Sequence, residues 1–291
     1  MRRIFALIVL LLAATPWVRG ADEPPPRDIR LEEKKFEQLS NQDADPLAAT
    51  ALAIDPTKWK HAETDHFILH YRHATEAQKV VREIEYDLWF VAKFLGASKE
   101  RYANKSHVYI FKDEPEWKKF LSKTDCPPWC SSFAHGDELF LHVGGIGEGF
   151  DSQTLAHETT HAVVARLYPN RQWPHWLNEG FAEYMSGASV AARKVLWAKG
   201  LQKDLSKGTL PLEQLTTTKN YPSDREAVHQ FYQSSEKLVR YLMDNFPKDR
   251  FPQFIDAILG GARFQDALLQ IYGDKIKDYL TFSRRYERFT K

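Results

Sequence analysis

Two histidines four residues apart have the types and spacing that best suit chemistry in this sequence. His157 and His161 lie in the segment 155–164, where flanking apolar residues favour a helix. Four residues make about one helical turn, so both imidazoles project from one face and can bind one ion. Glu158 follows the first histidine, so its carboxylate can reach a water on that ion. The pattern predicts metal-activated water with Glu158 as the base; two solvent-facing histidines are the alternative.

A second acidic cluster downstream offers the ligand that two histidines leave missing. A catalytic zinc ion takes three protein ligands and keeps its fourth position for water. Glu179 follows His161 by 18 residues, enough for a turn and a second helix that returns to the first. Glu183, one turn further on the same face, can accept the second ring N–H of a ligating histidine. We therefore predict one Zn²⁺ on His157, His161 and Glu179; for both glutamates the alternative is an exposed helical acid.

The two segments together resemble the gluzincin metallopeptidases, which include thermolysin and the aminopeptidase-N family. The similarity is carried by His-Glu-Thr-Thr-His at residues 157–161 and Asn-Glu-Gly-Phe-Ala-Glu-Tyr at residues 178–184. It implies that the two motif histidines and Glu179 bind zinc and that Glu158 is the general base. The compact layout is similar to the peptidase-MA-like proteins of bacteria, and the motif-level similarity covers about residues 131–242.

Residues 131–139 extend the resemblance to a segment that binds the substrate. This stretch resembles the edge segment that precedes the zinc helix in thermolysin-like enzymes and pairs with the substrate backbone. The residues concerned are Ser132, Phe133 and Ala134. An edge strand has unpaired N–H and C=O groups, so it can add an extended peptide as a further strand. An ordinary hairpin is the alternative.

A tyrosine further along is a candidate for stabilising the transition state. Residues 231–239 are similar to the helix on which the aminopeptidase-N family keeps its catalytic tyrosine. The resemblance points to Tyr232 as a phenol that donates to the developing oxyanion. Phe231 and Leu238 form part of the apolar stripe of this helix, so a core role for Tyr232 is the alternative. His229 is a weaker candidate for the same task.

One motif of the aminopeptidase-N family is missing. That family reads the free amine of its substrate with Gly-x-Met-Glu-Asn, whereas this chain has only a glycine run at residues 144–149 without the pattern. The run is not a phosphate loop either, since no Lys-Ser/Thr pair follows it. We therefore expect an endopeptidase rather than a strict aminopeptidase.

The N-terminus has the layout of an export signal over residues 1–20. Arg2 and Arg3 precede 11 apolar residues, and Gly20 ends a plausible cleavage zone. Eleven residues are too few for a bilayer, which needs about 20. We expect a periplasmic or extracellular protein with no stable membrane insertion after cleavage; an uncleaved anchor is the alternative.

The two cysteines are Cys126 and Cys130. In an exported protein a local disulfide between them is expected, and it would rigidify the turn before the substrate edge. Two free thiols, or a small metal site completed by His135, are the alternatives.

Composition narrows the classes of protein. The chain has 291 residues and a formal net charge of +1, with 40 Lys+Arg against 39 Asp+Glu. This balance argues against non-specific nucleic-acid binding, which needs a basic surface. Abundant aromatic residues (18 Phe, 12 Tyr and 8 Trp) favour collapse and argue against disorder. An ordinary globular protein remains.

The elements that must position these residues divide the chain after the signal. Residues 21–60 are polar and proline-punctuated, which indicates a linker or N-terminal extension with one short helix at 31–39. Residues 61–291 form the expected domain, with a sheet-bearing lobe over 61–150 and a helical lobe over 151–291. The first lobe has predicted strands at 66–71, 107–111 and 138–143 and helices at 77–95 and 114–121. This is an α+β arrangement, and the resemblance implies a zincin-like (thermolysin-like) catalytic domain with a mixed N-terminal sheet.

The predicted reaction is hydrolysis of a peptide bond in a peptide or protein substrate. A zinc-activated water attacks the carbonyl while Glu158 takes its proton. A zinc-bearing scaffold protein without catalysis, or a zinc amidase acting on a cell-wall crosslink, are the other functions that stay open. The sequence leaves open the oligomeric state and whether 21–60 is a propeptide.

Overall fold

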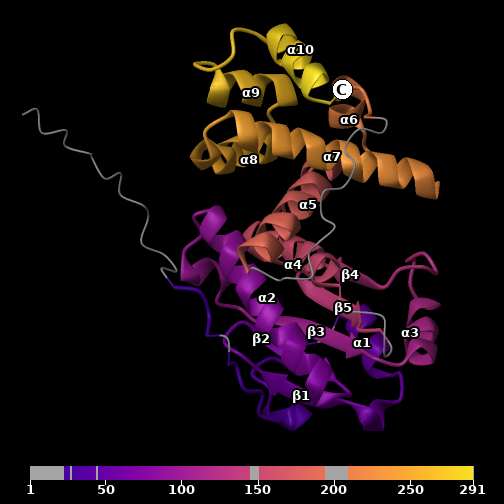
Figure 1. Cartoon of the computed structure of the whole chain (residues 1–291). Helices are drawn as coiled ribbons and strands as arrows, with labels where there is room; N and C mark the ends of the chain where they lie inside the picture. Colours follow the sequence, from indigo (N-terminus) through magenta and orange to yellow (C-terminus); the bar gives the residue numbers. More distant parts are fainter. Residues whose placement is uncertain (1–22, 27, 44, 145–150, 194–208, 291) are drawn as a thin grey trace, which may run out of the picture.

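The structure, a computed structural model, has a five-stranded sheet in its N-terminal half and only helices among the described residues after 150 (Figure 1). This confirms the predicted α+β class with a mixed sheet followed by a helical lobe. The predicted export signal and most of the glycine run lie outside the described residues. The described residues are 23–26, 28–43, 45–144, 151–193 and 209–290.

The sheet has the strand order β1-β2-β3-β5-β4, so β4 is an edge strand. Strands β2, β3 and β5 are parallel, whereas β1 and β4 run antiparallel to their neighbours. The β4–β5 hairpin turns at Gly136, whose φ of 57° is a left-handed conformation that glycine adopts without strain. The predicted substrate segment is therefore the edge strand that the resemblance implies. The strands are β1 (Lys60–Glu63), β2 (Phe67–Tyr71), β3 (Ser106–Phe111), β4 (Ser132–His135) and β5 (Glu138–His142).

Alternation along the strands divides the core between the two faces of the sheet. Val108 and Ile110 of β3 belong to the large core beneath α2 (Ala74–Phe94) and α4 (Ser152–Leu167). Tyr109 and Phe111 of the same strand belong to a second core on the opposite face. The side-chain period of two in a strand produces this division.

The N-terminal extension completes the second core. Helix α1 (Pro46–Leu52) packs there beside α3 (Glu114–Leu121), and Ile54 and Trp59 are buried between them and the sheet. The Trp59 indole N–H donates to the Ile54 carbonyl at 3.1 Å. Of the two alternatives for residues 21–60, a linker or an N-terminal extension, residues 46–59 thus behave as an extension that packs on the domain.

The helix predicted over residues 31–39 is wrong. Only a 3₁₀ turn, Phe36–Gln38, forms there. Lys34 instead forms a β-bridge with His61, and its N–H donates to the His61 carbonyl at 2.8 Å. Pairing with the edge of β1 competes with the helix, because the backbone groups of Lys34 are used in the bridge.

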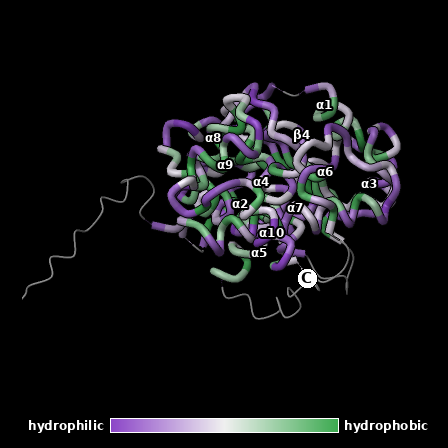
Figure 2. The backbone as a smooth tube through the Cα atoms, turned by 90° about the horizontal axis from the view of Figure 1, so that it is seen from above, coloured by the Kyte–Doolittle hydropathy of each residue, from purple (hydrophilic) through white to green (hydrophobic). Residues whose placement is uncertain are grey.

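Three helices, α4, α5 (His175–Ala192) and α7 (Arg225–Asn245), pack against one another in series and connect the sheet with the helical lobe. Helix α5 lies between α4 and α7, as Figure 1 shows. Viewed from above, apolar residues gather toward the middle of the molecule and hydrophilic residues lie mostly toward its periphery (Figure 2). None of the described helices is both long and apolar enough to cross a membrane. The remaining helices are α6 (Leu212–Thr217), α8 (Phe251–Leu259), α9 (Phe264–Tyr272) and α10 (Tyr279–Phe289).

A glycine lets α5 and α7 approach closely, so its replacement is expected to destabilise the protein. A Cβ atom at Gly180 would lie 2.3 Å from the Ser235 carbonyl oxygen and 2.8 Å from Val239 Cγ2. Gly180→Ala is expected to lower the free energy of unfolding by about 1–3 kcal/mol, because overpacking outweighs the better helix propensity of alanine. Denaturant unfolding checks this value.

The same helix offers a matched control. A Cβ atom at Gly187 meets nothing within 4 Å, so Gly187→Ala is expected to stabilise by up to about 1 kcal/mol. Equal effects of the two substitutions would contradict a close α5–α7 contact at Gly180.

Three histidines in contact, two of them buried, lie across neighbouring strands of the sheet and are expected to make stability depend on pH. His61 Nδ1 lies 2.8 Å from His70 Nδ1, and His70 Nε2 lies 2.9 Å from His107 Nδ1. Burial lowers the pKa of His70 to about 2 and also lowers the pKa values of the other two. The unfolded chain therefore binds more protons than the folded one below pH 6.5, and stability falls as pH drops through that value.

This pH dependence is expected to weaken when the central histidine is replaced. Between pH 6 and pH 5, the free energy of unfolding of wild type should fall by about 1.4 kcal/mol per pH unit more than that of His70→Phe. The reason is that the variant lacks the histidine that takes up one proton when the wild-type chain unfolds. Urea unfolding of both proteins at several pH values measures the difference. Parallel pH curves would show that His70 remains accessible to protons in the folded protein.

Candidate metal centre

Helix α4 places the two motif histidines side by side. It begins at Ser152, and the preceding Asp151 side chain accepts a hydrogen bond from the Gln153 N–H at 3.0 Å. One turn of this helix separates His157 and His161, whose Nε2 atoms lie 3.0 Å apart. The local sequence thus sets the first two donors, as helix geometry predicts.

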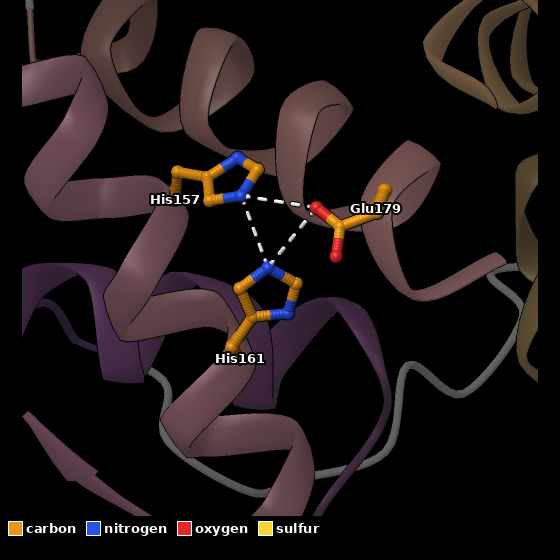
Figure 3. Close-up of side chains that lie close together, drawn as sticks. All are labelled: His157, His161 and Glu179. Atoms are coloured by element: carbon orange, nitrogen blue, oxygen red, sulfur yellow. Dashed lines mark hydrogen bonds and ion pairs between the residues drawn. The ribbon is translucent and has the colours of Figure 1, made fainter. Parts of the chain in front are cut away.

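The third donor comes from the neighbouring helix. Glu179 on α5 places its Oε2 atom 3.3 Å from His157 Nε2 and 3.5 Å from His161 Nε2 (Figure 3). The three donor atoms lie within 4.8 Å of one another, and the described residues contain no other such group of three. The 18-residue spacing therefore returns the chain to the predicted place.

The chemistry of these donors fits a divalent zinc ion. Two imidazole nitrogens and one carboxylate oxygen form the protein ligand set of many hydrolytic zinc sites. Glu179 Oε2 is buried and makes no hydrogen bond of normal geometry. His161 Nδ1 is also buried and has no hydrogen-bond partner. A buried acceptor of this kind costs free energy unless a cation or donor satisfies it.

Charges around the centre alter two pKa values strongly. Burial raises the pKa of Glu179, but the two histidines outweigh burial and hold that pKa well below its usual range. Burial lowers the pKa of His157, but Glu179 and the other nearby glutamates raise it to about 9. The carboxylate thus remains ionised, as a metal ligand must.

Glu158 faces the edge strand. Its Oε2 atom accepts a hydrogen bond from the Ala134 N–H of β4 at 3.0 Å. Burial raises the pKa of Glu158, which brings this carboxyl closer to the neutral range suited to a general base. The predicted base and the predicted substrate strand are therefore in direct contact.

The side chain of Phe133 and the carbonyl of Ser132, the other two predicted strand residues, have partners other than Glu158. The Phe133 ring stacks on Phe140 at 5.1 Å between centroids and packs in the second core, on the opposite face of the sheet from α4. Ser132 accepts a hydrogen bond on its carbonyl from the Cys130 thiol at 3.1 Å. The Phe133 ring is thus directed away from the metal centre.

The predicted supporting residues also lie near the centre. Glu183 Oε1 lies 3.6 Å from His157 Nδ1, the ring nitrogen that points away from Glu179. Tyr232 on α7 places its ring centroid 6.2 Å from that of His157, and burial raises the pKa of its phenol. His229, one turn earlier, contacts Gln233 at 2.8 Å.

A pocket of about 590 Å³ opens at the start of α7 beside the centre. It is lined by Asp224, Arg225, Glu226, Val228, His229 and Tyr232. Tyr232 and His229 are the predicted site residues that line it, and none of the three donors does. Space for a ligand therefore exists where the predicted phenol lies.

A residue absent from the sequence-based predictions contacts the third donor. The Tyr221 hydroxyl donates to Glu179 Oε1 at 2.5 Å. Tyr221 belongs to the polar connection between α6 and α7, which has no helical or strand periodicity. The one sequence feature that could have drawn attention to Tyr221 is an aromatic residue before Pro222 in a polar connection. This feature does not indicate that the hydroxyl contacts Glu179.

The predicted disulfide is not formed. Cys126 and Cys130 are free thiols in this structure. A hydrogen bond with Cys130 lowers the pKa of Cys126 to about 7, and Cys130 in turn donates to the Ser132 carbonyl. The alternative metal site with His135 is also not formed, because that ring lies 3.5 Å from Asp45 instead.

Comparison with known proteins places the chain in a family. The profile of the peptidase MA superfamily matches residues 102–286, which include the whole candidate centre and more than half of the chain. The chain belongs to the peptidase MA superfamily. Its mixed sheet followed by a helical lobe agrees with that assignment.

Distant relatives of this peptidase MA protein are aminopeptidases. It is 25% identical to leucine aminopeptidase 2 of Candida albicans over 183 residues, which cover 56% of this chain and 29% of that protein. It is 26% identical to aminopeptidase M1-C of Oryza sativa subsp. japonica over 147 residues, covering 44% and 17%. The matched part is thus less than a third of either relative. These similarities support a hydrolase of the metallopeptidase type.

Proposed function

We propose that this protein hydrolyses peptide bonds with one zinc ion bound by His157, His161 and Glu179. The observation that carries the proposal is the convergence of these three donors on two packed helices. When bound, zinc supplies a Lewis acid that lowers the pKa of water to about 7 and polarises the substrate carbonyl. Two histidines and one glutamate on helices favour zinc over iron or manganese for hydrolysis.

Glu158 acts as the general base in this proposal. Its carboxylate takes a proton from the attacking water and passes it to the leaving amine. The Ala134 N–H, at 3.0 Å from Oε2, holds the carboxylate in one orientation. A fixed base loses less entropy when the reaction occurs.

Tyr232 and Glu183 support the reaction from two other helical positions. The phenol of Tyr232, kept protonated by its raised pKa, donates to the oxyanion that develops on the substrate. The Glu183 carboxylate, 3.6 Å from His157 Nδ1, attracts that ring nitrogen and favours the orientation in which Nε2 is directed toward Glu179. Each residue thus has a task that its neighbours do not duplicate.

The substrate in this proposal is an extended peptide or protein segment. No strand pairs with the outer edge of β4 among the described residues, which leaves room for β-addition of an extended peptide beside the Ala134 N–H that donates to Glu158. The missing amine-recognition motif favours cleavage at internal bonds. The N-terminal signal pattern supports substrates outside the cytoplasm, in the periplasm or the extracellular space.

Zinc analysis combined with peptide-library cleavage tests this function. We expect one zinc per chain and cleavage of internal bonds in peptides, with similar rates for free and acetylated N-termini. Faster cleavage of free N-termini would contradict the endopeptidase assignment. Bound zinc without any peptide cleavage would contradict the peptidase assignment, and release of cell-wall fragments would then support an amidase.

A further inference from the structure

We propose that Tyr221 is a positioning residue that makes Glu179 a one-oxygen metal ligand and thereby strengthens metal binding. This inference rests on the proposed function, because it concerns the same three donors. It adds a third element, the connection before α7, to a centre otherwise built from α4 and α5.

The two oxygens of Glu179 have different neighbours. Oε1 accepts the Tyr221 hydroxyl at 2.5 Å, whereas Oε2 lies 3.3 Å and 3.5 Å from the two imidazole nitrogens. Oε2 is buried against the two imidazoles and makes no hydrogen bond of normal geometry. The phenol therefore occupies one oxygen and leaves the other directed at the metal position.

Packing holds the Tyr221 ring in place although the residue is 42% exposed. Its ring centroid lies 4.1 Å from that of His175, which is one turn before Glu179 on α5. It also lies 6.1 Å from the Phe231 ring of α7 in an edge-on contact. The ring is thus fixed between the first turn of α5 and α7, with its hydroxyl at the carboxylate.

This geometry has a consequence for the carboxylate. Without the phenol, Glu179 can rotate about its terminal torsion, which is broad for a carboxylate, and present either or both oxygens. Hydrogen bonds to ligating groups usually contribute about 10–100-fold to metal affinity. Removing the hydroxyl should therefore weaken metal binding without changing which residues bind.

The test replaces Tyr221 by phenylalanine in the full chain and measures the zinc dissociation constant by competition with a chromophoric chelator. We expect Tyr221→Phe to bind zinc about 10–100-fold more weakly than wild type. Tyr184→Phe is the matched control, because it removes a phenol from α5 whose hydroxyl contacts Lys248 rather than Glu179. Its zinc affinity should match wild type.

Two further measurements separate positioning from other roles. The melting temperature of metal-free Tyr221→Phe should match that of metal-free wild type, whereas the increase on adding zinc should be smaller. In cobalt-substituted protein, the visible absorption should weaken if the carboxylate binds through both oxygens and raises the coordination number.

Several results would overturn the proposal. Wild-type zinc affinity in Tyr221→Phe would do so, and so would a loss of turnover with unchanged zinc affinity, which would make Tyr221 a catalytic residue. Failure of wild type to bind zinc would instead reject the proposed function itself, so the two failures are distinguishable.

Discussion

Glu158→Gln is expected to abolish peptide cleavage while zinc stays bound. The amide cannot take a proton from water, and loss of a general base typically costs about 10²–10⁴-fold in rate. The three metal donors are untouched, and the glutamine carbonyl can still accept the Ala134 N–H. Turnover of a fluorogenic peptide, measured together with zinc content, checks both halves of this prediction.

A second buried glutamate provides the control for this substitution. Glu85 on α2 is 3% exposed and contacts His66 at 2.7 Å, away from the metal donors. Glu85→Gln should lower stability and leave the turnover number unchanged. If Glu158→Gln cleaved peptides as fast as wild type, another residue would have to be the base.

Tyr232→Phe is expected to lower the turnover number by about 10²–10³-fold with little change in the Michaelis constant. The loss is that of one donor to the oxyanion, a group that exists only as the transition state forms. Zinc affinity should fall less than in Tyr221→Phe, because Glu179 keeps the Tyr221 hydroxyl at 2.5 Å. Steady-state kinetics and chelator competition on the same preparations provide both values.

Another tyrosine of the same helix serves as the control. Tyr241 is 4% exposed and packs edge-on against Phe282, 5.4 Å away between ring centroids. Tyr241→Phe should therefore leave turnover unchanged. A wild-type turnover number for Tyr232→Phe would assign Tyr232 to the core, which is the alternative that its place beside Phe231 suggests.

The predicted elements agree best with the structure where one short segment determines its own conformation. The helix predicted at residues 114–121 is α3, and the strands at 66–71, 107–111 and 138–143 are β2, β3 and β5 within one residue at each end. These segments have clear periodicity, and one or both of their faces are buried against apolar residues. The short helix predicted at 31–39 failed because a distant strand, β1, offered its backbone partners.

In the metal centre, too, local sequence predicts some positions and leaves others unpredicted. The spacing of His157 and His161 on one helix brings their nitrogens together whatever the rest of the fold does. Glu179 could be placed because only a turn separates α4 from α5. Tyr221, by contrast, reaches Glu179 across 42 residues of chain, and no local pattern indicates such a contact.

The sequence by itself thus predicted the α+β class, the side chains that converge on α4 and α5 and the candidate base, because helix and strand periods over a few residues, with one short connection, fix most of their positions. The tertiary structure alone decided that Ala134 contacts Glu158, that Tyr221 holds Glu179 and that the extension fills the second core. These contacts join elements far apart in the chain, so they depend on how the sheet and helices pack together.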